Sequence, residues 1–162
     1  MRGCWNYSRS VAFAEKVSAN PAGRSKGKLV AKTQAGVAAE LRVVVVEDEP
    51  LIRWMISDEL RDLGFNVSEF STADDAWGYI LSGSRVDVVF TDIRLPGTLN
   101  GLELAHLIEA EAMHVKAVVI TSSHLPQDAC SFKGRFIAKP YNHPAVATLL
   151  MELAQGEDLA AA

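Results

Sequence analysis

The chain has 162 residues, of which 49% are apolar and 22% are charged, and its formal net charge is −4 at pH 7. This length suits one domain with a substantial core and is too short for two large ones. No stretch approaches the roughly 20 apolar residues that span a bilayer, which excludes an integral membrane protein. The two cysteines, Cys4 and Cys130, have neither the number nor the spacing of a disulfide scaffold or a zinc site, so a reducing cytoplasm is the simplest setting.

The charge is divided unevenly along the sequence. Residues 1–40 hold seven Lys or Arg against two acids, whereas residues 41–162 hold nine cations against eighteen acids. The first segment also lacks a sustained apolar period, so it cannot bury enough surface to offset the entropy lost on ordering. We predict a basic, disordered arm at 1–40, more simply a solvated tail than a nucleic-acid contact. A folded domain at 41–156 and a short tail at 157–162 complete the predicted organisation.

From residue 41 onward, short apolar runs alternate with segments of helical period. The run at 41–46 predicts a buried strand, and the run at 66–70 predicts a second one. Between them, Pro50 opens a helix and Gly64 ends it. The apolar residues of this helix keep a spacing of about 3.6 and predict its buried stripe: Ile52, Met55, Ile56, Leu60 and Leu63.

The second half of the chain continues this alternation. Thr72 is typical of a helix N-cap and opens a second helix. Three further strands and two further helices are predicted: strands at 86–91, 115–121 and 135–138, a helix around 102–108, and a last helix from Pro144. Strands separated by helices require a parallel sheet covered on both faces, so the predicted fold class is α/β.

Chemically active side chains follow the carboxyl ends of the predicted strands. Glu47 and Asp48 follow the first strand, Asp92 the third, Thr121 the fourth and Lys139 the fifth. In open parallel sheets the functional groups gather outside these ends. Converging carboxylates repel one another unless a hard cation lies among them, and oxygen ligands suit magnesium (Mg²⁺). A carboxylate beside such a cation can accept a phosphoryl group, whose oxygens a hydroxyl and an ammonium would bind.

Each of these residues also has a simpler explanation. An acid after a first strand can merely cap the next helix, Thr121 can bond a loop amide, and Lys139 can be a solvated surface residue. All four strand ends would then carry a suitable group by coincidence. The sequence therefore favours one shared site.

Four motifs, VVVVEDEP, VDVVFTDIRLPG, VVITSS and FIAKP, occur in this order and resemble the receiver domain of two-component response regulators. The resemblance extends from Leu41 to about Gly156. It implies a five-stranded parallel sheet of strand order 2-1-3-4-5 with helices on both faces, a flavodoxin-like arrangement.

The resemblance also implies roles for single residues in a Mg²⁺-dependent phosphoryl transfer from a sensor histidine kinase or a histidine phosphotransfer protein. These roles are Asp92 as phosphoacceptor, Asp48 and Asp92 as direct metal ligands, Glu47 as a ligand through water, the backbone carbonyl of Arg94 as a further ligand, Thr121 as switch hydroxyl, Lys139 as phosphate-binding cation, and Phe136 as the aromatic that follows the switch. The Lys139–Pro140 peptide bond is expected to be cis.

Two departures from the family pattern carry expectations. The segment between Thr121 and Lys139 is a few residues shorter than in most receivers, so the fourth helix, near 126–132, should be short or irregular. That puts in doubt the dimerisation surface that many receivers build there. The loop at 97–101 is slightly longer than usual, a variant associated with bacterial stand-alone receivers.

Rival classes are less well supported by the sequence. An aspartyl-phosphate phosphatase of the haloacid-dehalogenase type needs a second Asp two positions after the first, where this chain has Arg94. An inert docking receiver would not need the complete set of acids, hydroxyl and lysine. We therefore expect a single-domain receiver without a DNA-binding domain, which signals to an unknown protein target by contact. It would not be an enzyme beyond its own phosphorylation and dephosphorylation, and its location would be cytoplasmic.

Trp54 is a candidate partner contact. It lies two positions after Ile52, about 200° around a helix, and so should face away from the buried stripe. An exposed Trp near a phosphoacceptor suits a protein interface, although the ring could also lie flat on its own domain.

Overall fold

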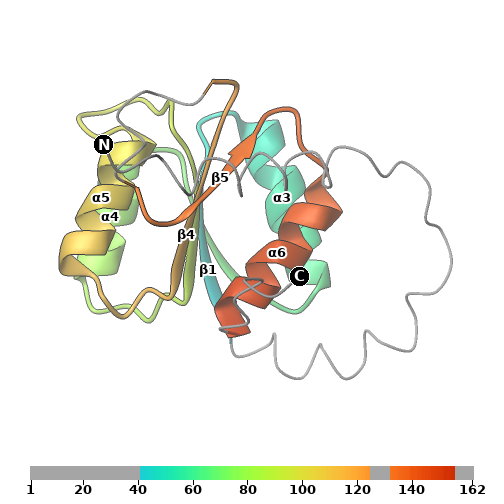
Figure 1. Cartoon of the computed structure of the whole chain (residues 1–162), viewed down its shortest axis with the longest axis horizontal. Coiled ribbons are helices and arrows are strands. Elements are labelled where there is room, and N and C mark those ends of the chain that lie inside the picture. Colours follow the sequence, from blue (N-terminus) through green and yellow to red (C-terminus); the bar gives the residue numbers. More distant parts are fainter. Residues whose placement is uncertain (1–40, 125–131, 156–162) are drawn as a thin grey trace, which may run out of the picture.

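The computed structural model describes residues 41–124 and 132–155, which form a parallel sheet between two layers of helices (Figure 1). The strands are β1 (Arg42–Val46), β2 (Asn66–Phe70), β3 (Val88–Asp92), β4 (Ala117–Ser122) and β5 (Arg135–Ala138). The helices are α3 (Pro50–Asp62), α4 (Ala73–Leu81), α5 (Gly101–Glu111) and α6 (His143–Gln155). The strand order β2-β1-β3-β4-β5 confirms the predicted fold class.

Three expectations concern segments outside the described residues. These are the basic arm at 1–40, the tail at 157–162 and the short fourth helix near 126–132, of which only Phe132 is described.

Local signals explain where the helices begin. The hydroxyl of Thr72 accepts a hydrogen bond from the Asp75 backbone N–H at 3.1 Å, which confirms the predicted N-cap of α4. Asn100 and Glu103 form a reciprocal capping box at α5, which satisfies backbone donors that the first turn leaves free. These caps fix the helices directly after the loops that follow β2 and β3.

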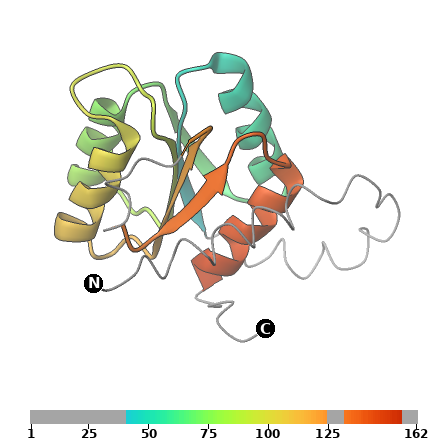
Figure 2. The same cartoon turned by 45° about the horizontal axis from the view of Figure 1, so that its top comes forward.

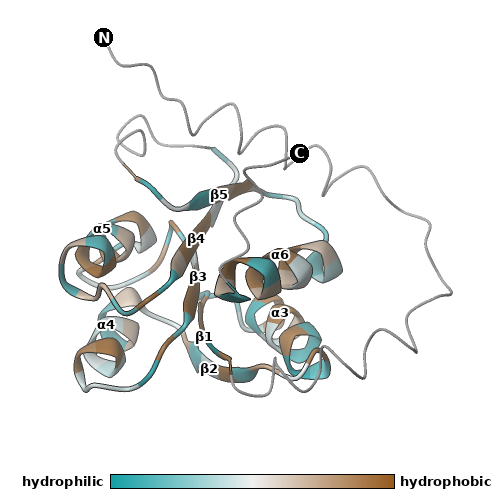
Figure 3. Cartoon of the chain, turned by 60° about the horizontal axis from the view of Figure 1, so that its bottom comes forward, coloured by the Kyte–Doolittle hydropathy of each residue, from teal (hydrophilic) through white to brown (hydrophobic). Residues whose placement is uncertain are grey.

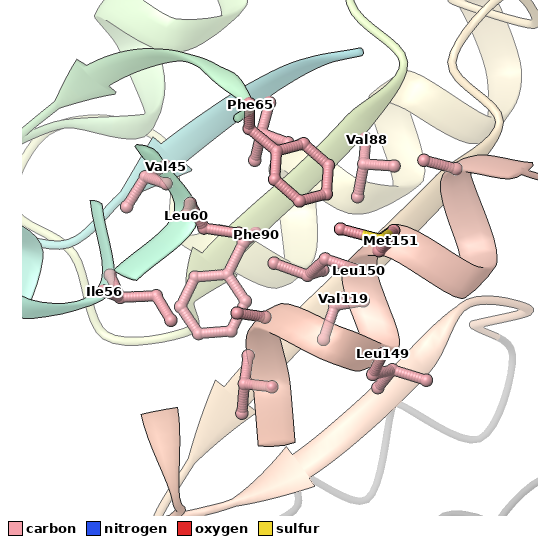
Figure 4. Packing of buried hydrophobic residues seen from close by; sticks show 14 of the residues in the cluster. Val45, Ile56, Leu60, Phe65, Val88, Phe90, Val119, Leu149, Leu150 and Met151 are labelled. Atoms are coloured by element: carbon pink, nitrogen blue, oxygen red, sulfur yellow. The ribbon is translucent and has the colours of Figure 1, made fainter. Parts of the chain in front are cut away.

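The two helix pairs cover opposite faces of the sheet, α3 and α6 on one face and α4 and α5 on the other (Figure 2). Alternate residues of each central strand therefore enter different clusters, so that Phe90 packs towards α3 and α6 and Val89 towards α4 and α5. Figure 4 shows Phe90 among Ile56, Leu60 and Leu150. Burial on both faces explains why these strands read as continuous apolar runs, seen as brown ribbon in Figure 3.

One detail of the predicted α3 stripe is wrong. Met55 is 41% exposed, whereas Ser57, which the apolar pattern passed over, is fully buried. The reason is that α3 buries a narrow stripe centred on Ile56 and Leu60, and Met55 lies outside it. Trp54 is 56% exposed, as its position on the helix predicted.

The parallel strands bring their carboxyl ends to one edge of the sheet. Backbone hydrogen bonds continue past the strand ends there, from Ile93 N to Thr121 O and from Lys139 N to Ser122 O, both at 2.9 Å. This edge therefore holds the residues that follow β3, β4 and β5 in fixed positions. No helix among the described residues has the length and apolar character needed to cross a membrane.

Candidate functional site

Three carboxylates meet at the carboxyl edge of the sheet. Glu47 follows β1 and is 1% exposed, Asp92 ends β3 and is 6% exposed, and Asp48 is exposed beside them. One oxygen from each of the three lies within 4.8 Å of the others. The structure thus brings together the acids that the sequence placed at separate strand ends.

Lys139 contacts two of these carboxylates. Its Nζ atom lies 2.9 Å from Glu47 Oε2 and 3.1 Å from Asp92 Oδ2. Partial burial disfavours the ammonium, but the hydrogen bonds and charges of Glu47 and Asp92 outweigh it and raise the pKa of Lys139. Lys139 is therefore a charged member of the site and not a freely solvated surface lysine.

The site keeps a surplus of negative charge. Burial, assisted by the nearby charge of Asp92, raises the pKa of Glu47, although the hydrogen bond from Lys139 opposes that shift. One ammonium thus faces three carboxylates, two of them largely removed from water. Hard oxygen donors this close together suit a divalent cation such as Mg²⁺.

Hydrogen bonds that involve the main chain fix the positions of Asp92 and Glu47. Asp92 Oδ1 accepts a hydrogen bond from the Ile93 N–H at 2.9 Å, and the Glu47 carbonyl accepts one from Arg53 Nη1 at 2.6 Å. Gly101, at the start of α5, passes so close that a Cβ atom there would lie 1.8 Å from the Asp92 carbonyl oxygen. The sequence analysis missed this need for glycine, because only the folded chain brings α5 against the end of β3.

The loop after β3 is anchored by a second residue that the sequence analysis missed. Asp74, in the first turn of α4, accepts hydrogen bonds from Thr98 N at 3.0 Å, from Leu99 N at 3.3 Å and from the Thr98 hydroxyl. The hydrogen bond from the Thr98 hydroxyl is the main cause of a lowered pKa of Asp74, and the two backbone bonds add to it. Gly97 adopts φ +118°, a backbone conformation that favours glycine. The long loop after β3 is thus anchored to α4, and the sequence did not indicate this because an acid in the first turn of a helix is common.

Thr121 lies at the end of β4 and is completely buried. Its Oγ1 atom has no hydrogen-bond partner among residues 41–124 and 132–155. By strand alternation its side chain shares the face of Val119, on the side of α3 and α6. Phe136 is half-buried and packs on the opposite side, against the α4 and α5 cluster.

The remaining sequence-based expectations concern the residues next to Asp92 and Lys139. The Lys139–Pro140 peptide bond is cis, as expected. Arg94 has an exposed side chain, so the position at which an aspartyl phosphatase carries its second acid holds a cation here. Metal binding by the Arg94 carbonyl stays a prediction. Tyr141, which the sequence analysis did not select, packs edge-on against Phe90 next to the site, with ring centroids 5.9 Å apart.

The family of the chain follows from comparison with known proteins. A family model described as the response regulator receiver domain matches residues 43–150, which is more than half of the chain. The chain therefore belongs to the response regulator receiver family. This membership gives it a phosphoacceptor role in two-component signalling.

Curated relatives support the same class. Nitrogen assimilation regulatory protein NtrX of Azorhizobium caulinodans is 33% identical over 105 residues, which are 62% of this chain and 23% of that protein. The probable transcriptional regulatory protein TcrX of Mycobacterium tuberculosis is 33% identical over 88 residues, 53% of this chain and 36% of that protein. The sensor histidine kinase RcsC of Salmonella typhimurium is 26% identical over 89 residues, only 9% of its own length. This chain thus spans well under half the length of each relative.

Solved structures agree on the fold. A response regulator receiver protein from Sinorhizobium medicae superposes with a TM-score of 0.64 at 23% identity, covering 73% of this chain and 97% of the other. Chemotaxis response regulator CheY4 of Vibrio cholerae gives a TM-score of 0.60 at 21% identity, covering 70% and 98%. At these identities the likeness concerns the fold alone.

Proposed function

We propose that Asp92 is the phosphoacceptor and that it receives its phosphoryl group from the phosphohistidine of a sensor histidine kinase or of a histidine phosphotransfer protein. The observation that carries the proposal is the setting of the Asp92 carboxylate, with Oδ1 on the Ile93 N–H and Oδ2 3.1 Å from Lys139 Nζ. In the transfer, a new P–O bond forms to an Asp92 oxygen as the P–N bond of phosphohistidine breaks. The electron pair of that bond stays on the leaving imidazole.

We propose Mg²⁺ as the cofactor, held by Asp48 and Asp92 directly, by Glu47 through water and by the backbone carbonyl of Arg94. The donor set supports this choice, because its oxygens converge within 4.8 Å and burial already raises the pKa of Glu47. When bound, Mg²⁺ supplies positive charge that offsets the carboxylates and the phosphoryl oxygens.

The other site residues would act on the phosphoryl oxygens. The Lys139 ammonium, now shared by Glu47 and Asp92, would bind one of them as a point charge. The buried hydroxyl of Thr121 would donate a hydrogen bond to another, and the ring of Phe136, which packs on the opposite side of the sheet, would change its rotamer in response. Phosphorylation would in this way change the surface near β5 and α6.

We further propose that the output is a contact with a downstream protein and that the chain catalyses only its own phosphorylation and dephosphorylation. A cytoplasmic location accords with the sparse cysteines. The stand-alone architecture expected from the sequence stays a prediction, because the curated relatives carry the matching segment within longer chains.

The experiment is phosphorylation by a small donor such as acetyl phosphate, followed by intact-protein mass spectrometry. The wild type should gain one phosphoryl group when Mg²⁺ is present and none when a chelator removes it. Asp92→Asn should lower the labelling by about 100-fold or more, because an amide is not a carboxylate nucleophile. The control is Asp58→Asn on the exposed surface of α3, which should be labelled like the wild type. Normal labelling of Asp92→Asn, or an unlabelled wild type, would contradict the proposal.

A further inference from the structure

Two buried hydroxyls at the carboxyl edge of the sheet are unpartnered. They are Thr121 Oγ1 and Tyr141 Oη, neither of which forms a hydrogen bond of normal geometry within residues 41–124 and 132–155. Buried donors are rarely left unpaired in a folded protein. A third such hydroxyl, on Ser57, belongs to α3 and not to the strand ends. The two hydroxyls at the sheet edge instead lie near each other and beside the acids of the site.

The two hydroxyls lie on the same side of the sheet. Tyr141 packs against the α3 and α6 cluster, where its ring meets Phe90 edge-on at 5.9 Å and His143 at 5.3 Å. Thr121 points to that side by strand alternation, whereas Phe136 packs on the other side. Tyr141 is therefore the aromatic residue whose polar end is buried on the face that Thr121 occupies.

The surroundings of Tyr141 keep its phenol protonated. Burial raises the pKa of Tyr141, and the charges of Glu47 and Asp92 raise it further, while the nearby Thr121 hydroxyl lowers it only in part. The Tyr141 hydroxyl is thus a hydrogen-bond donor whose polar neighbours are Thr121 and the acids of the site.

The Thr121 and Tyr141 hydroxyls together lack one hydrogen-bond acceptor. Tyr141 brings one O–H, and Thr121 brings one O–H together with lone pairs that can accept. A bond from Tyr141 to Thr121 satisfies the phenol but leaves the Thr121 proton without an acceptor. A phosphoryl oxygen on Asp92 would be that acceptor, and both buried donors would then be paired.

We propose that Tyr141 is a positioning residue for phosphoryl recognition: its hydroxyl donates to Thr121 Oγ1 when the Thr121 hydroxyl donates to the phosphoryl group. This inference rests on the proposed role of Asp92. Tyr141 favours the phosphorylated state because that state alone pairs both hydroxyls, and a ligand shifts an equilibrium only through such a difference between states. The hydrogen-bond chain also fixes the rotamer in which Thr121 meets the phosphoryl oxygen.

The test is a double-mutant cycle with beryllofluoride, a mimic of the phosphoryl group, titrated calorimetrically in the presence of Mg²⁺. Tyr141→Phe keeps the ring contacts and removes only the hydroxyl, so its apparent dissociation constant should rise about three- to tenfold. In the Thr121→Ala background, Tyr141→Phe should cause no further rise. In the Thr121→Ser background, which keeps a hydroxyl, the rise should return. Tyr79→Phe is the control: it removes a hydroxyl bonded to Ser68 at 3.2 Å, away from the site, and should leave binding unchanged.

The possible outcomes separate this inference from the proposed function. A Tyr141→Phe variant that binds beryllofluoride like the wild type would overturn the positioning role alone. So would a Tyr141→Phe change that lowers the affinity equally in the wild-type and Thr121→Ala backgrounds. A wild type that does not bind the mimic would overturn the proposed function, and the inference with it. Circular dichroism of each variant verifies that the compared proteins share one fold.

Discussion

Carboxylates are buried at both edges of the sheet, but their charges are balanced differently. At the amino edge, Asp87 is 3% exposed, and its Oδ2 accepts a hydrogen bond from the Arg42 N–H at 2.9 Å. Its Oδ1 lies 3.2 Å from Lys116 Nζ and 3.4 Å from Arg85 Nη2. Burial opposes the charge, yet these partners prevail and lower the pKa of Asp87. Lys116 also donates to the Ala154 carbonyl at 2.9 Å, which ties α6 to this edge.

The carboxyl edge has the opposite balance. There the pKa of Glu47 is raised by burial, and Lys139 is shared between Glu47 and Asp92. The Thr121 hydroxyl is left unpartnered among the described residues. The charge of Asp87 at the amino edge is thus compensated within the chain, whereas the carboxyl edge keeps the excess of negative charge on which the proposed cation and phosphoryl sites rest.

The same substitution at the two edges should have different effects on stability. Asp87→Asn leaves Lys116 and Arg85 facing a neutral amide and should lower the free energy of unfolding by about 2–3 kcal/mol. The matched change Asp92→Asn relieves repulsion and should leave the free energy of unfolding unchanged or slightly higher. Urea unfolding in a chelating buffer measures both. Equal losses at the two edges would contradict the comparison.

The Asp87 contribution should depend on pH. An acid whose folded pKa is depressed contributes stability that is present above its unfolded pKa and is lost as the pH falls through the folded pKa. For Asp87 the unfolded value is near 3.8 and the folded value is lower. The stability advantage of the wild type over Asp87→Asn should therefore persist at neutral pH and shrink below about pH 4. Unfolding curves between neutral and acidic pH test this, and an advantage that grows on acidification would refute it.

Glu47→Gln tests the contrast between the two edges at the carboxyl edge. Because the pKa of Glu47 is raised, its charged form costs stability at neutral pH, and this cost disappears as the carboxyl is protonated at lower pH. The neutral amide should raise the free energy of unfolding of the metal-free chain by up to about 1 kcal/mol. The same change should weaken Mg²⁺ binding in a calorimetric titration. A less stable variant that binds Mg²⁺ like the wild type would show that Glu47 is structural.

Trp54→Ala should have the smallest effect of these changes. It should slow phosphoryl transfer only when the donor is a protein. The exposed indole lies on α3 near the carboxyl edge, so its loss should slow transfer from a histidine kinase that phosphorylates this chain by about three- to tenfold. Labelling by acetyl phosphate should not change. Met113→Ala, an exposed apolar control after α5, should leave both reactions unaffected. A Trp54→Ala variant that accepts phosphate from the kinase at the wild-type rate would remove Trp54 from the interface.

Local signals made most of the fold predictable. Pro50, the Thr72 cap and the β-branched run at 43–46 act through their immediate neighbours, so their effects can be predicted without knowledge of the fold. The convergence of Glu47, Asp92 and Lys139 was also predictable, because parallel strands end at one edge.

The features that escaped prediction depend on tertiary distances. Gly101 is required by its approach to Asp92, and Asp74 matters because a loop 24 residues away bonds to it. The sequence does not single out Tyr141, because only the fold brings its hydroxyl to the side of the sheet on which Thr121 lies. Met55 has the right helical period but lies outside the narrow stripe that α3 buries.

The most direct test of the central claim locates the phosphoryl group. The chain is phosphorylated by acetyl phosphate with Mg²⁺, the acyl phosphate is reduced with borohydride, and the modified residue is identified by peptide mass spectrometry. Reduction is expected at Asp92 and not at Asp87, which is also buried but whose charge is compensated by its partners. Modification at any other carboxylate in place of Asp92 would contradict it.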